Sequence, residues 1–135
     1  MGTSIASPAD QELADRLYKQ GVEILGQEST AFRMAIDGAV KDLRVMFGNV
    51  IPKKETDRLV HDYVLQEKFP DRFVAYLEDE TEEEGETRLQ RETRAAAPSL
   101  AKLEQLIKAL PTEQQKRIEV RYVRDPLAGF RLKAN

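Results

Sequence analysis

The densest group of chemically active side chains in this sequence is a run of seven carboxylates within nine residues, with no basic residue among them. The seven are Glu78, Asp79, Glu80, Glu82, Glu83, Glu84 and Glu86. Acidic residues at positions 80, 82 and 84, followed by Gly85, repeat the start of a calcium-binding EF-hand loop, but the twelfth position, which needs a bidentate carboxylate, is Arg91. The pattern therefore favours a solvated, mobile acidic segment over a calcium site. Such a segment could dock on a basic protein partner or imitate the phosphates of a nucleic acid.

Few other residues could carry out catalysis. The chain has no cysteine and a single histidine, His61, and no motif marks a serine nucleophile that this histidine could activate. Glycine-rich phosphate loops and carboxylates at metal-binding helical spacing are also missing from the sequence. We therefore predict a protein that is not an enzyme and that binds no metal or cofactor.

The composition is that of a helical protein with a strongly charged surface. Hydrophobic residues make up 41% of the chain and charged residues 33%, with a net charge of −3. No apolar run is long enough to span a bilayer, and the N-terminus lacks the apolar segment of a signal peptide. These features predict a soluble, cytoplasmic protein.

Three helices are predicted in the first half of the chain. The first runs from Pro8 to Leu25, with Ser7 as its N-cap, and the second begins after Ser29 or Thr30. The third spans residues 52–69 and ends before Pro70. The second helix has the most regular apolar stripe, which consists of Phe32, Ile36, Val40, Leu43 and Phe47. Short connections predict that the first two helices form an antiparallel pair.

The middle of the chain has weaker signals. Pro70 could start a short fourth helix with Phe73, Val74, Tyr76 and Leu77. The acidic run is followed by a stretch rich in arginine, which we interpret as a solvated helix or a mobile linker. We expect an N-terminal helical bundle over residues 1–77, a charged linker or helix over 78–98, and a C-terminal part over 99–135 that packs on the first as one domain.

A further helix is predicted from Ser99 onward. Leu100, Leu103, Ile107 and Leu110 have the three–four–three spacing of coiled-coil a and d positions. The helix could belong to the core of the domain or form the seam of a homodimer. In the dimer hypothesis, Tyr122 and Phe130 would extend the apolar surface.

The C-terminal segment LPTEQQKRIEVRYV, residues 110–123, resembles the opening of region 4 of bacterial sigma factors. That resemblance implies a DNA-reading domain with two further helices. Only twelve residues follow Val123, and Pro126 is among them, so we expect no recognition helix here.

The same residues have the alternation of a β-hairpin. Ile118, Val120 and Tyr122 alternate with charged residues, and so do Phe130 and Leu132. Between them, the sequence DPLAG at 125–129 suits a tight turn. We predict a hairpin, with a helix over residues 112–135 as the alternative. The hairpin would display Arg121, Arg124, Arg131 and Lys133, much as the wing of a winged-helix protein displays its basic residues.

Together these features predict a mainly α fold, with four to five helices and a small C-terminal β-hairpin. The predicted function is that of a protein-interaction or assembly protein of bacterial, plasmid or phage type, which could self-associate and which docks a protein partner through its acidic segment. The alternative is a winged-helix-like DNA-binding transcriptional regulator that uses the basic hairpin.

Overall fold

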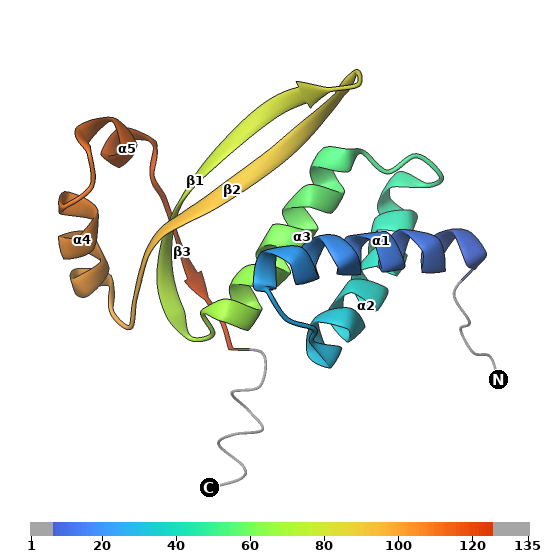
Figure 1. Cartoon of the computed structure of the whole chain (residues 1–135), viewed down its shortest axis with the longest axis horizontal. Coiled ribbons are helices and arrows are strands. Elements are labelled where there is room, and N and C mark those ends of the chain that lie inside the picture. Colours follow the sequence, from blue (N-terminus) through green and yellow to red (C-terminus); the bar gives the residue numbers. More distant parts are fainter. Residues whose placement is uncertain (1–6, 126–135) are drawn as a thin grey trace, which may run out of the picture. The chain divides into compact units, whose positions relative to one another are not determined.

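The computed structural model describes residues 7–125, which form five helices and a three-stranded antiparallel sheet (Figure 1). The prediction of a mainly α chain with a small hairpin is confirmed only in part, because helices make up 56% of the chain but the sheet, at 24% strand, is a larger part of the fold than a hairpin. The described chain divides into two compact units. Unit 1 contains residues 7–64 and 82–88, and unit 2 contains residues 65–81 and 89–125.

The three N-terminal helices form as predicted. They are α1 (Pro8–Leu25), α2 (Thr30–Phe47) and α3 (Lys53–Lys68). The Ser7 hydroxyl accepts a hydrogen bond from the third residue of α1, and the Ser29 hydroxyl does the same for α2. α1 ends at Gly26, which has a left-handed backbone with φ of 79°.

The core of unit 1 is made from one apolar face of each helix. Its fully buried side chains include Leu17 of α1, Phe32 and Ile36 of α2, and Val60 of α3. Gly21 lets the Phe32 ring approach α1 closely, because a Cβ at this position would lie 2.0 Å from the Phe32 Cζ. The apolar residues at helical spacing in the sequence are therefore the ones that form this core.

The acidic segment has a different structure from the predicted one. Strands β1 (Arg72–Glu83) and β2 (Glu86–Ala97) form a long hairpin. Its two-residue turn, Glu84–Gly85, has φ values of 53° and 80°, as a type I′ turn requires. The predicted short fourth helix after Pro70 and the predicted linker or helix in the acidic and arginine-rich stretch are therefore wrong.

Burial on both faces explains why the first strand resembled a helix. Val74 and Tyr76 pack with Val123 in one apolar cluster, whereas Ala75 packs with Leu103 in another. A strand that is buried on both faces has a continuous apolar run instead of alternation, and such a run cannot be told from a buried helix by period alone.

The C-terminal part of unit 2 contains α4 (Leu100–Lys108), α5 (Thr112–Arg117) and β3 (Glu119–Val123). β3 pairs antiparallel with β1 from Arg72↔Val123 to Tyr76↔Glu119. The first arm of the predicted hairpin is thus a strand, but its partner in the described structure is β1. The second arm, with Phe130, Arg131 and Lys133, lies outside the described residues.

Candidate interaction surface at the hairpin tip

The carboxylates of the acidic run face cations that are distant in the sequence. In unit 2, Arg91 of β2 forms an ion pair with Glu78 of β1 at 2.6 Å, and Arg117 of α5 pairs with Asp79. The Arg91 guanidinium also lies over the Tyr76 ring, 4.4 Å from its centroid. The expected like-charge repulsion is therefore reduced by residues that the fold brings to the strand, so the acidic segment has regular β structure.

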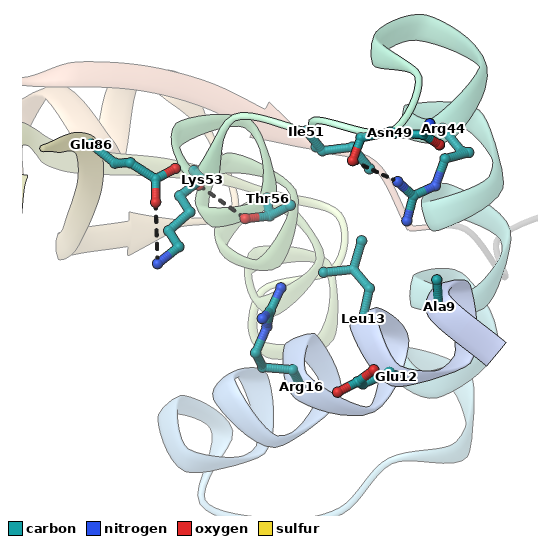
Figure 2. Close-up of a pocket in the computed structure, with 10 residues that line it drawn as sticks. All are labelled: Ala9, Glu12, Leu13, Arg16, Arg44, Asn49, Ile51, Lys53, Thr56 and Glu86. Carbon is teal, nitrogen blue, oxygen red and sulfur yellow. Dashed lines mark hydrogen bonds and ion pairs between the residues drawn. The ribbon is translucent and has the colours of Figure 1, made fainter. Parts of the chain in front are cut away.

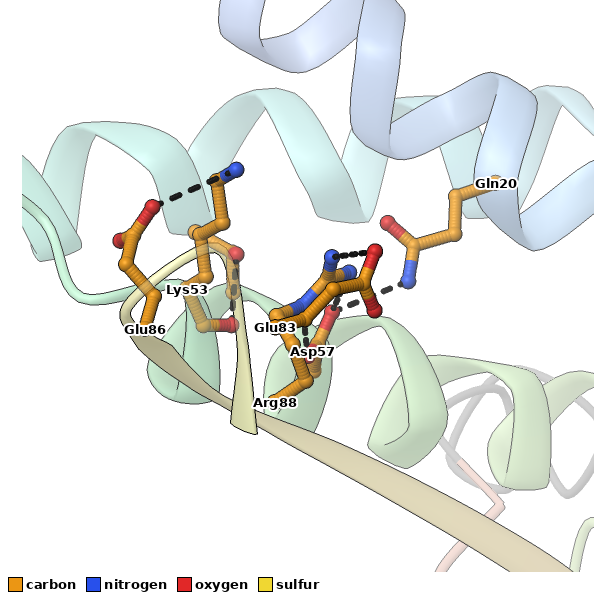
Figure 3. A network of polar contacts seen from close by, with 7 residues as sticks. Gln20, Lys53, Asp57, Glu83, Glu86 and Arg88 are labelled. Atoms are coloured by element: carbon orange, nitrogen blue, oxygen red, sulfur yellow. Dashed lines mark hydrogen bonds and ion pairs between the residues drawn. The ribbon is translucent and has the colours of Figure 1, made fainter. Parts of the chain in front are cut away.

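The tip of the hairpin, residues Glu82–Arg88, is fixed to the helices of unit 1 by a buried carboxylate (Figure 3). Asp57 of α3 is 1% exposed and accepts two hydrogen bonds of 2.8 Å from the Arg88 guanidinium. The Gln20 side chain of α1 donates a third at 3.2 Å. This bidentate geometry raises the pKa of Arg88, chiefly through the hydrogen bonds to Asp57. The guanidinium is therefore a permanent charge that holds the tip in place.

Contacts at the tip leave most of its carboxylates on the surface. Lys53 pairs with Glu86 at 3.3 Å, and the Thr87 hydroxyl donates to Glu82 at 2.7 Å. Glu83 reaches the Arg88 guanidinium only at 4.0 Å. Because Asp57 offsets Arg88 and Lys53 offsets Glu86, the carboxylates of residues 82, 83 and 84 give the tip an excess of three negative charges.

A surface pocket of about 300 Å³ lies beside the tip in unit 1 (Figure 2). Glu86 and Lys53 line it on the hairpin side, and Arg44 lines it near the connection between α2 and α3. Glu12 and Arg16 of α1 also line the pocket, and among residues 7–125 neither forms an ion pair. The walls thus carry charges of both signs, which suits a protein surface more than a specific small anion.

Exposed apolar side chains occur near the end of α2, in the same unit as the tip. Val45, Met46 and Val50 are 87%, 72% and 82% exposed. Val50 is also flanked in the chain by Asn49 and Ile51, which line the pocket. Exposed apolar side chains mark surfaces that bind other proteins where they form one patch, so these three residues are candidates for such a surface.

The other predicted site residues fall in several places. Leu103 is fully buried in the core of unit 2, which agrees with the hypothesis that this helix belongs to the core. Leu100 is 45% exposed, and Ile107 and Leu110 are partly buried. Tyr122 is 49% exposed on β3. Of the basic residues, Arg121 is partly buried and already has a partner, and Arg124 is exposed.

The carboxylates of the tip were predicted from the sequence, but the residues that fix the tip to the helices of unit 1 were not. Asp57 and Lys53 were not predicted as site residues, and Arg88 lay in the stretch that was interpreted as a solvated helix or a mobile linker. The exposed residues Val45 and Met46 were not singled out either. The one available signal for the hairpin was Gly85 between two long polar stretches, since a glycine suits the left-handed second position of a type I′ turn.

Within residues 7–125, no group of three or more His, Cys, Asp or Glu side chains could hold a metal ion. His61 lies partly buried on α3 and has an interaction partner. None of the helices in the described part of the chain has the length and apolar character that a membrane span needs.

No family model matches the sequence, and no curated protein or solved structure shows significant similarity to it.

Proposed function

We propose that this chain is a non-enzymatic protein-interaction protein that docks through unit 1 on a partner with basic and apolar side chains. The observation that carries the proposal is the group of exposed apolar residues Val45, Met46 and Val50 in the unit that also contains the acidic tip. Neither surface feature is needed for the core of unit 1, which other side chains fill.

The two features would contribute differently to docking. Complete burial of a valine or methionine side chain stabilises a complex by about 1.5–3 kcal/mol relative to exposure, so the apolar residues would supply most of the affinity. The three excess carboxylates of the tip would instead speed the approach of a basic partner and orient it. The Asp57–Arg88 pair supports both roles, because it orders the tip before binding and so lowers the entropy cost of docking.

The experiment is quantitative affinity capture from an extract of the source organism, followed by titration of the purified partner. Two variants test the surface: Val45→Thr with Met46→Gln, and Glu82→Gln with Glu83→Gln and Glu84→Gln. Matched controls in unit 2 are Leu106→Gln, which changes an exposed apolar residue, and Glu104→Gln with Glu113→Gln, which removes exposed charges.

We expect the apolar variant to weaken binding about tenfold or more. The tip variant should mainly lower the association rate and its dependence on salt. Both controls should bind like the unmodified chain. Equal capture by all variants would contradict the proposal. A gel shift with generic duplex DNA at low salt tests the DNA-binding alternative, for which a strong dependence on salt concentration is expected.

A further inference from the structure

We propose that the outer edge of β3 in unit 2 pairs with β3 of a second copy of this chain, in antiparallel register around Val120. β3 is the last strand in the order β2–β1–β3, and within residues 7–125 no strand pairs with its other side. An edge strand presents unpaired N–H and C=O groups, which another strand can satisfy. This inference concerns unit 2 and does not depend on the proposed docking through unit 1.

Strand geometry limits the possible registers. Residues directly opposite each other in an antiparallel pair point to the same face of the sheet, so a two-fold axis must place one residue opposite its own copy. An axis at Arg121 would place two arginines together, and an axis at Glu119 would place two glutamates together. An axis at Val120 avoids both contacts.

The register around Val120 is self-complementary in charge. Glu119 of each copy lies opposite Arg121 of the other, so the interface contains two opposite-charge pairs related by symmetry. Arg121 already has an interaction within its own chain, but a guanidinium carries five N–H donors and can bond a carboxylate in addition. Cross-strand pairs of opposite charge stabilise a sheet, whereas like charges destabilise it.

The other face of β3 supplies apolar contacts in the same register. Val120 and Tyr122 are opposite Ala75 and Phe73 of β1, and so they share the sheet face on which Leu103 is buried. They remain 45% and 49% exposed. Pairing around Val120 places the valine opposite its own copy and Tyr122 opposite Ile118. The apolar face of unit 2 would then continue from one copy into the next.

The main test compares the self-association of full-length variants by sedimentation equilibrium. The unmodified chain should show a monomer–dimer equilibrium. Glu119→Lys makes both interface charges of a copy positive, and Arg121→Glu makes both negative. Each variant should therefore weaken its own dimer by about tenfold or more, which corresponds to about 1.4 kcal/mol. Glu104→Lys, which changes an exposed residue of α4 in the same unit, should leave the dimer unchanged.

Mixing the two variants gives the sharpest result. Every cross-strand charge pair between Glu119→Lys and Arg121→Glu chains is of opposite sign, so the mixture should form heterodimers although each variant alone is mainly monomeric. A variant that merely disturbs folding would not be rescued in this way. Mixtures that stay monomeric, or an unmodified chain that is monomeric at the highest soluble concentration, would overturn the proposal.

A cross-linking experiment tests the register itself. Because the chain contains no cysteine, Val120→Cys introduces a single thiol. In the proposed dimer this thiol lies opposite its own copy, and directly opposite strand residues are within the Cα range of disulfides. Oxidation should therefore give a disulfide-linked dimer rapidly, and much more slowly for Glu104→Cys. Equal rates for the two variants would show that the register is wrong.

Discussion

The two ends of the β1–β2 hairpin are held in place by different forces. At the base, four consecutive residues of β1, Val74–Leu77, are buried in unit 2. At the tip, residues 82–86 are exposed, and the charged pair of Asp57 and Arg88 secures the turn in unit 1. One hairpin thus combines an apolar, non-directional anchor with a polar, directional one.

The difference matters because the two anchors respond differently to a missing partner. Loss of an apolar contact costs stability in proportion to the area and cavity that remain. Loss of one member of a buried ion pair leaves a charge without compensation, which costs more than the intact pair contributes. The tip is therefore the more fragile of the two anchors, although it contains the stronger contacts.

The largest effect is expected for Arg88→Met. The variant removes the Arg88 guanidinium from the Asp57 carboxylate, whose side chain is 2% exposed, so we expect a loss of about 3–5 kcal/mol in the free energy of unfolding. Denaturant unfolding measures this change. The matched control is Arg117→Met, which removes the exposed ion pair to Asp79 and should cost less than about 1 kcal/mol.

A double variant sharpens this comparison. Asp57→Leu together with Arg88→Met replaces the pair by apolar side chains and should recover most of the stability lost in Arg88→Met. A single variant that unfolds at the same denaturant concentration as the unmodified chain would show that the tip is held by other contacts. The apolar base alone would then be enough to order the hairpin.

A smaller effect is expected at the turn, where Gly85→Ala tests whether the tip depends on its backbone conformation. Gly85 has φ of 80°, and no atom lies within 4 Å of a Cβ built there, so strain and not a clash opposes alanine. A left-handed backbone costs about 1–2 kcal/mol for a residue with a Cβ, and we expect a loss of this size. Thermal unfolding measures it.

Gly38→Ala is the control, because Gly38 lies exposed on α2 with equally open space and a helical backbone. There alanine should stabilise the chain by about 0.5–1 kcal/mol. Opposite signs for the two glycines would confirm that the turn geometry limits the tip. A Gly85→Ala variant as stable as the unmodified chain would mean that the turn tolerates a side chain.

The contrast between base and tip also explains what the sequence could predict. α1, α2 and α4 have N-cap serines and apolar residues at helical spacing, and these local signals identified them. β1 has no alternation because both of its faces are buried, so its apolar run was read as a helix. Some of the cations that pair with the acidic run are not near it in the sequence. Arg117 lies 38 residues from Asp79, and such a pairing exists only in the folded chain.

The candidate site was predictable only in part, for the same reason. The excess of negative charge at Glu82, Glu83 and Glu84 is a property of the sequence and was found there. The Asp57–Arg88 pair spans 31 residues and depends on the turn at Gly85, which places β2 next to β1. The exposure of Val45 and Met46 could not be predicted from the sequence, because the helix contains many apolar residues and its pattern identifies the buried stripe but not the apolar residues outside it.

The smallest effect concerns Tyr76, which lies in the apolar base of the hairpin, and it appears only at alkaline pH. The pKa of the Tyr76 phenol is raised, chiefly by burial. The nearby charges of Arg91 and Arg121 oppose this rise, whereas those of Glu119 and Glu78 add to it. In the folded state the neutral phenol is therefore favoured. Its contribution to stability is complete below the ordinary tyrosine pKa of about 10 and is lost as the pH rises through the folded value.

Tyr76→Phe should consequently flatten the fall in unfolding free energy above about pH 10, with little change near neutrality. Denaturant unfolding across this alkaline range measures the slope. Some alkaline sensitivity should remain, because the pKa values of Tyr63 and Tyr122 are raised as well, by burial and by the hydrogen bond to Asp71 respectively. An unchanged slope in Tyr76→Phe would show that burial in the apolar base does not raise the pKa of this phenol.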